Sequence, residues 1–176
     1  LITSEQIYST VATPFLHFHP VLTPYLRTQP DADNASLQLR YAEGYSEISR
    51  YLYYEEIRDP FPVRELMRRE LPNLRRALKI LWKTGKTDAF AETADCISRF
   101  LTILGHTRER DEIRKQIESA ALIASECSGK LLTRAEFLRE SGLGEDEFER
   151  GNISAANARY THLLERILAQ PLGAQF

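Results

Sequence analysis

Few residues in this chain have a type and spacing that could perform chemistry, and two histidines are the most suggestive. His17 and His19 form an H-x-H pair, which on a β-strand would direct both imidazoles to one face and could hold a metal ion. The nearby Pro20 and Pro24 favour a helix or an irregular turn instead, and no cysteine or carboxylate lies within ten residues of the pair. The sequence therefore predicts no metal site.

The spacing of serine, cysteine, histidine and acidic residues does not indicate catalysis by a nucleophile or by a pair of carboxylates. No Ser-His-Asp or Cys-His set can be assembled. A solvated helix face explains the acidic residues better than general acid–base work does. These residues are Asp111, Glu112, Glu145, Asp146, Glu147 and Glu149. We therefore predict a non-enzymatic protein without catalytic residues.

A phosphate-binding loop is suggested by Gly85-Lys86-Thr87 but is rejected by its context. A P-loop needs a glycine five residues before its Gly-Lys pair, where this chain has Ile80, and no strand is predicted to precede it. A helix cap followed by a turn explains the segment better. We predict no cofactor.

A basic stretch offers a binding surface rather than chemistry. It comprises Arg64, Arg68, Arg69, Arg75, Arg76, Lys79, Lys83 and Lys86. At helical spacing, several of these residues share one side with Trp82, and arginine and tryptophan are frequent anchors of protein interfaces. The alternative is an ordinary solvated helix face with a buried Trp82.

Composition and charge exclude several classes of partner. The chain has 176 residues, 43% hydrophobic and 27% charged, with a formal net charge of −2, so neither nucleic acid nor an anionic membrane is expected. Cys96 and Cys127 form no C-x-x-C pair, and neither a signal pattern nor a membrane-spanning apolar run is found, which favours the cytoplasm. The chain begins at Leu1 and its only methionine is Met67, so we expect a piece of a longer polypeptide.

Apolar residues recur at helical spacing between sparse glycines and prolines, and no convincing strand period is found. Pro72 should kink or restart the helix that contains it. The connections at Lys83–Thr87, Gly105–Thr107 and Gly151–Asn152 are too short for anything but antiparallel neighbours. The predicted helices span about 4–12, 14–28, Ala35–Ile57, Val63–Lys83, 87–104, Thr107–Ala124, Thr133–Arg150 and 153–169.

The last two helices carry a motif. Leu143-Gly144, then Gly151-Asn152-Ile153, then Ala156 and Tyr160 resemble the tetratricopeptide repeat. The resemblance implies that Leu143 and Gly144 let the first helix approach its partner, that Gly151 makes the turn, and that Ala156 and Tyr160 lock the second helix in place.

The motif has departures. Glu140 and Glu147 replace the tryptophan and tyrosine of the pattern, and residues 87–126 resemble a degenerate repeat with Arg110 and Arg114 at the lock positions. The segment Glu70–Leu78 is similar to one in tetratricopeptide arrays that follow nucleotide-binding modules in signal-transducing ATPases and bacterial regulators.

This resemblance implies an all-α fold of antiparallel helix pairs stacked as a short right-handed superhelix. Residues 59–176 would form degenerate repeats, and residues 1–58 a helical capping or linking segment. In such arrays the first helix of each pair lines a concave, peptide-binding surface. By resemblance, that surface would be lined by Arg75, Lys79, Trp82, Lys83, Glu92, Asp95 and Arg99.

The expected function is therefore a scaffold that binds a protein, a peptide or another domain of the parent chain. The alternative is a regulatory module that senses a small ligand in an enclosed pocket near the tyrosines of residues 41–54. Nucleic-acid binding through the basic stretch is disfavoured by the acidic total.

Overall fold

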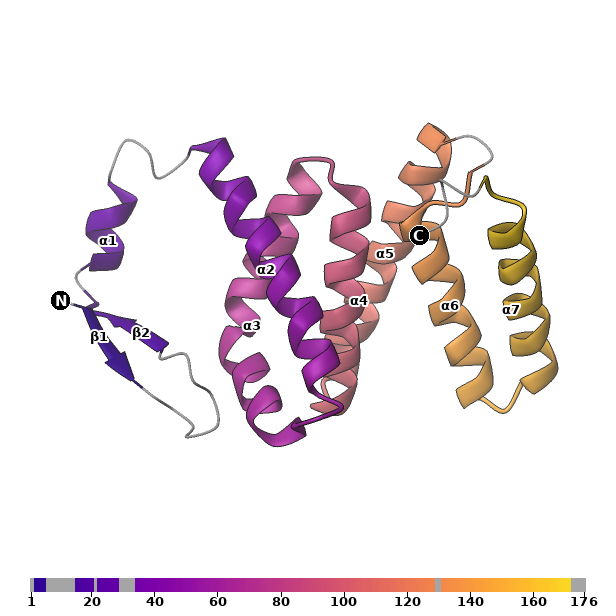
Figure 1. Ribbon diagram of the computed structural model, residues 1–176, viewed down its shortest axis with the longest axis horizontal. Helices are drawn as coiled ribbons and strands as arrows, with labels where there is room; N and C mark the ends of the chain where they lie inside the picture. Colours follow the sequence, from indigo (N-terminus) through magenta and orange to yellow (C-terminus); the bar gives the residue numbers. More distant parts are fainter. Residues whose placement is uncertain (1, 6–14, 21, 29–33, 129–130, 172–176) are drawn as a thin grey trace. The chain divides into compact units, whose positions relative to one another are not determined.

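The computed structural model describes residues 2–5, 15–20, 22–28, 34–128 and 131–171. The described residues form seven helices and two short strands, which confirms the predicted all-α class (Figure 1). The chain divides into two compact units, Leu1–Arg40 and Tyr41–Phe176, and each is considered by itself.

The first unit contains a small hairpin that the sequence interpretation missed. Strand β1 (Ile2–Glu5) pairs antiparallel with β2 (Phe15–Phe18), and Ile2 faces Phe18 in the register. The prediction of helices at about 4–12 and 14–28 was therefore wrong for residues 4–5 and 15–18, while 6–14 lie outside the described residues. The same finding corrects His17, which lies on a strand rather than in a helix or turn.

Helix α1 (Leu22–Arg27) is the only helical part of the predicted 14–28 helix among the described residues. Its short length agrees with Pro24, which fits only the first turn of a helix because proline lacks an N–H donor. The aromatic Phe15 and Phe18 favour a strand, but such a short strand needs a partner distant in sequence, which helical periodicity cannot reveal.

The long helices from Ala35 onward agree closely with the prediction, and all but the start of the first of them belong to the second unit. Helix α3 continues through Pro72, so the predicted fresh start at this residue is absent. Its beginning at Pro60 follows the rule that proline is tolerated in a first turn. The helices are α2 (Ala35–Glu55), α3 (Pro60–Lys83), α4 (Thr87–Ile103), α5 (Thr107–Ser128), α6 (Arg134–Glu149) and α7 (Ile153–Leu168).

Three corners reverse the chain in the same way. Gly85, Gly105 and Gly151 have φ values of 68°, 76° and 83°, a left-handed conformation that glycine adopts without steric cost. The N–H of the residue after each glycine donates to the carbonyl five residues earlier, which closes the helix end. These bonds join Lys86 to Leu81 at 3.0 Å, His106 to Leu101 at 2.8 Å and Asn152 to Glu147 at 2.8 Å. The repeated corner makes successive helices antiparallel (Figure 1).

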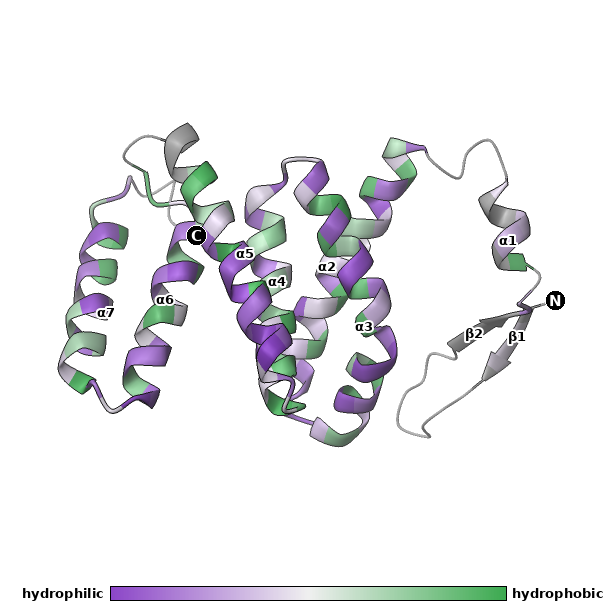
Figure 2. Cartoon of the chain, turned by 180° about the vertical axis from the view of Figure 1, so that it is seen from behind, coloured by the Kyte–Doolittle hydropathy of each residue, from purple (hydrophilic) through white to green (hydrophobic). Residues whose placement is uncertain are grey.

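Helix α4 is the centre of the hydrophobic core. It contacts α3, α5 and α6, and Phe90, Ile97 and Leu101 are fully buried along it. Helix α4 is therefore packed between neighbouring helices. The neighbouring helices carry both hydrophobic and hydrophilic residues, as amphipathic helices do (Figure 2). Each such buried side chain stabilises the fold by roughly 1.5–3 kcal/mol.

Small hydroxyl side chains connect α2 to α4. The Thr93 hydroxyl lies 2.8 Å from the Ser46 hydroxyl and also donates to the Ala89 carbonyl at 2.8 Å. Thr93 and Ser49 are completely buried. Because buried polar groups need partners, these bonds let polar residues occupy the interface at little cost. Helix α2 therefore belongs with the core through its second half.

Candidate binding groove between α3 and α5

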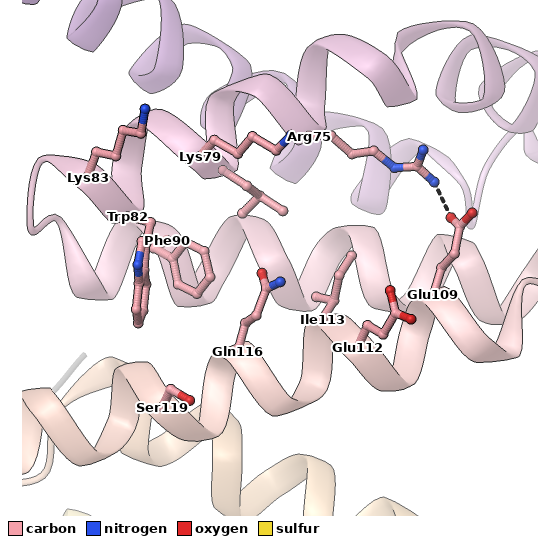
Figure 3. Close-up of a pocket in the computed structure, with 11 residues that line it drawn as sticks. Arg75, Lys79, Trp82, Lys83, Phe90, Glu109, Glu112, Ile113, Gln116 and Ser119 are labelled. Atoms are coloured by element: carbon pink, nitrogen blue, oxygen red, sulfur yellow. Dashed lines mark hydrogen bonds and ion pairs between the residues drawn. The ribbon is translucent and has the colours of Figure 1, made fainter.

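A groove between α3 and α5 has a volume of about 570 Å³ (Figure 3). Both helices run in the same direction along it, and Phe90 of α4 lies beneath it. The groove is lined by Arg75, Leu78, Lys79, Trp82, Lys83, Phe90, Glu109, Glu112, Ile113, Gln116 and Ser119.

The two walls of the groove differ in charge. Arg75, Lys79 and Lys83 recur every four residues and therefore lie on one face of α3. The α5 wall instead carries Glu109 and Glu112, followed by the neutral polar residues Gln116 and Ser119. An ion pair between Arg75 and Glu109 joins the walls at one end (Figure 3).

Two cations of the α3 wall remain available to a ligand. Lys79 and Lys83 are exposed, and neither forms an ion pair with any residue that the structure describes. Arg75 differs, because its guanidinium is already held by Glu109. Lys83 lies at the end of the groove that contains Trp82, whereas Lys79 extends from the middle of the α3 wall toward Arg75 (Figure 3).

The floor of the groove is apolar and partly open. The ring centroids of Trp82 and Phe90 lie 5.1 Å apart in a tilted arrangement, and Trp82 is 42% exposed. Leu78 and Ile113 are buried beside them. Trp82 is thus not the buried residue of the alternative interpretation. A half-exposed tryptophan beside unpaired cations is typical of a binding surface.

The predicted binding residues separate into two sets. The structure brings Arg75, Lys79, Trp82 and Lys83 together in the groove. It places Glu92, Asp95 and Arg99 elsewhere, on the face of α4 directed toward α2 and α6. The separation arises because Phe90 points to α3 and α5, whereas the polar positions of α4 occupy its other side.

The second set of residues is already engaged in ion pairs. Arg99 binds Asp95 at 3.0 Å and Glu145 at 2.9 Å, and its guanidinium lies 5.5 Å from the centroid of the Tyr53 ring. Burial opposes the charge of Arg99, but the two carboxylates outweigh it and raise the pKa of this group. Glu92 binds Arg134 at 2.9 Å. These residues connect helices, so binding a partner here would first require their pairs to separate.

A small cavity beside Tyr53 and Tyr54 tests the expectation of a ligand pocket near the tyrosines. Its volume is about 70 Å³, whereas pockets for drug-sized ligands span roughly 300–1,000 Å³. Cys96 borders it, and burial, reinforced by the charge of Asp95, raises the pKa of this thiol to about 11. The thiol therefore stays protonated near neutral pH and is a poor nucleophile.

The five residues of the repeat motif occupy the α6–α7 hairpin. Gly144 and Tyr160 meet across the interface, since a Cβ atom at Gly144 would lie 2.7 Å from Cζ of Tyr160. The Tyr160 hydroxyl donates to the Ser141 carbonyl at 3.3 Å. Ala156 is buried in the same interface, Gly151 forms the corner, and Leu143 is half-buried.

An ionic cluster occupies the two positions where the repeat pattern has aromatic residues. Arg159 of α7 binds Glu140 at 2.5 Å and Glu147 at 2.9 Å, both on α6. Burial opposes ionisation of Glu140, but hydrogen bonds from Arg139 and Arg159 outweigh it and lower its pKa. The hydrogen bond from Arg159 likewise lowers the pKa of Glu147. Sequence reasoning missed Arg159, although the seven-residue spacing of the two glutamates places them on one helix face.

Comparison with family models, curated proteins and solved structures found no match. Within the described residues, no three His, Cys, Asp or Glu side chains gather as they would around a metal ion. None of the described helices combines the length and apolarity required to cross a membrane. The geometry of the groove is therefore the basis for inferring function.

Proposed function

We propose that this chain is a non-catalytic protein-interaction scaffold whose α3–α5 groove binds a segment of a partner protein or of another domain of its parent. The observation that carries the proposal is the half-exposed Trp82 on an apolar floor, next to two lysines without ion-pair partners. An exposed aromatic ring beside unpaired cations adds little to the stability of the fold, whereas interfaces commonly combine an aromatic anchor with cations. We place this activity in the cytoplasm.

The proposed architecture is tetratricopeptide-like, with the pairs α2–α3, α4–α5 and α6–α7. Supporting contacts run from α4 to α6, between first helices, and from α5 to α6, between successive pairs. The family resemblance implies binding on the surface of the first helices. In this chain the larger groove lies between the second helices α3 and α5, and we therefore propose binding there.

Charge reversal within the groove tests the proposed function. The 176-residue chain is immobilised, and the proteins it retains from a cell extract at physiological salt are quantified. The variant K79E/K83E should lose a specifically retained partner. A matched control, K115E/R150E, reverses the same number of charges at exposed positions outside the groove and should keep it. Equal retention by both variants, or no specific retention by the unmodified chain, would refute the proposal.

A further inference from the structure

We infer that the occupant of the α3–α5 groove is an acidic amphipathic helix of a partner protein. The inference rests on the proposed binding function and specifies the chemistry of the partner. It follows from the length of the groove, the nature of its walls, its apolar floor and the position of its unpaired charges.

The length of the groove suits two turns of an α-helix. Arg75 and Lys83 lie at its two ends on α3, eight residues apart. At a rise of about 1.5 Å per residue, this separation corresponds to roughly 12 Å. A docked helix parallel to the walls would place about eight residues, or two turns, within the groove. This is the span of an i, i+3/i+4, i+7 set of anchoring side chains.

The walls favour a helix over an extended segment. Both walls are helices, so their backbone N–H and C=O groups are satisfied internally and offer no ladder to an incoming strand. Only Gln116 and Ser119 provide neutral polar side chains. An extended segment would therefore bury its own backbone groups against an apolar floor with few partners, which is costly. A helix satisfies these groups itself.

The floor supplies contacts for the apolar face of that helix. The apolar residues that line the groove are Leu78, Trp82, Phe90 and Ile113. The Trp82 ring is the most exposed of these groups and would lose the most contact with water on binding. Trp82 is therefore the expected main anchor of the interface, near one end of the groove (Figure 3).

The unpaired lysines determine the charge expected of the partner. Lys79 and Lys83 are four residues apart on α3, which separates their Cβ atoms by about 5–6 Å. Two Asp or Glu residues with the same spacing on the docked helix would match both ammonium groups. A helix with the opposite charge would gain less on the other wall, because Glu109 is already paired with Arg75 and Glu112 lies 3.5 Å from Arg108.

The chain contains its own probe for this inference, since Trp82 is its only tryptophan. Three tryptophan-free peptides of about 18 residues, long enough to form a helix, share one leucine stripe. The first carries glutamates four apart beside the stripe, the second carries lysines at those positions, and the third is the acidic peptide with a central proline. Trp82 emission is followed during titration of the unmodified chain at physiological salt.

We expect the acidic helix to shift Trp82 emission to shorter wavelength and to bind at least tenfold more tightly than the lysine peptide or the proline peptide. In K79E/K83E the order of the acidic and lysine peptides should reverse, whereas K115E/R150E should bind like the unmodified chain. Circular dichroism of each variant checks that it remains folded, and calorimetry with the unmodified chain measures binding without relying on emission.

The outcomes separate this inference from the proposed function. If the lysine or proline peptide binds in the groove as tightly as the acidic helix, the acidic-helix inference is wrong, but a binding groove remains. If no peptide affects Trp82 while a retained cellular partner is still lost in K79E/K83E, the inference is again refuted and the proposed function stands. Absence of both effects refutes both.

Discussion

The close approach of Gly144 to Tyr160 permits a prediction about helix packing in the α6–α7 hairpin. In Gly144→Ala, the new Cβ would lie 2.7 Å from Cζ and 3.0 Å from the hydroxyl oxygen of Tyr160. Contacts under 3.0 Å force a displacement, and the Tyr160 ring is restrained by its hydrogen bond to the Ser141 carbonyl. The ring is 38% exposed, so it can relieve part of the overlap by moving outward.

Two opposing effects determine how Gly144→Ala changes the free energy of unfolding. Replacing glycine by alanine within a helix stabilises it by roughly 0.5–1 kcal/mol, because the unfolded chain loses conformational freedom. Overpacking costs about 1–3 kcal/mol, and the partial exposure of the ring places this site toward the lower end. With an overpacking cost of about 1–2 kcal/mol, the difference between the two effects lowers the free energy of unfolding of Gly144→Ala by up to about 1.5 kcal/mol.

Gly142→Ala is the matched control, since a Cβ at Gly142 on the same helix meets nothing within 4 Å. It should raise the free energy of unfolding by about 0.5–1 kcal/mol. Urea unfolding followed by circular dichroism measures both variants, with unchanged slopes showing that stability alone has altered.

A double-mutant cycle identifies the cause. In a Tyr160→Ala background the obstacle is gone, so Gly144→Ala should become stabilising, with a coupling energy of about 1–2 kcal/mol. The reasoning would be refuted if Gly144→Ala stabilised the unmodified chain as much as Gly142→Ala does.

Three further predictions concern a corner, a cap and an ionic cluster. Gly151→Ala places a Cβ in the left-handed conformation, and thermal unfolding should show a loss of about 1–2 kcal/mol. Thr133→Ala removes the side chain that accepts the Glu136 N–H at the start of α6 and should cost about 1 kcal/mol in urea unfolding. The pKa values of Glu140 and Glu147 are lowered in the folded state, so their stabilisation is complete above about pH 4.5 and is lost as the pH falls through the lowered values. In Arg159→Ala, the stability should fall less as the pH is lowered, and urea midpoints at neutral and acidic pH measure this difference. An unchanged dependence of stability on pH would contradict the assigned cause.

The helices from Ala35 onward could be predicted because their signals are local. Amphipathic spacing marks each helix, and a glycine in the left-handed conformation ends α3, α4 and α6. The strands Ile2–Glu5 and Phe15–Phe18 could not be predicted in this way, because their pairing joins residues distant in sequence and each is too short to show a period. The local rule that proline restarts a helix likewise failed at Pro72, which lies inside α3.

The proposed binding groove was predictable only in part. The four-residue spacing of Arg75, Lys79 and Lys83 fixes their common face whatever the tertiary structure. Which neighbour each face of α4 contacts depends on packing, so Glu92 could not be assigned correctly to a shared surface. The α5 wall was missed for a related reason: Glu112 on an isolated helix looks like any solvated residue, and only the parallel α3 turns it into one side of a groove.

The three glycine corners have a consequence for how this chain can be rearranged. Each corner is closed by main-chain hydrogen bonds, so it specifies a reversal of direction without specifying which helices it joins. The α6–α7 hairpin is therefore held together by contacts between its own two helices, at Gly144 and Arg159. Transplanted behind another helix with a compatible apolar face, the hairpin should keep its internal geometry.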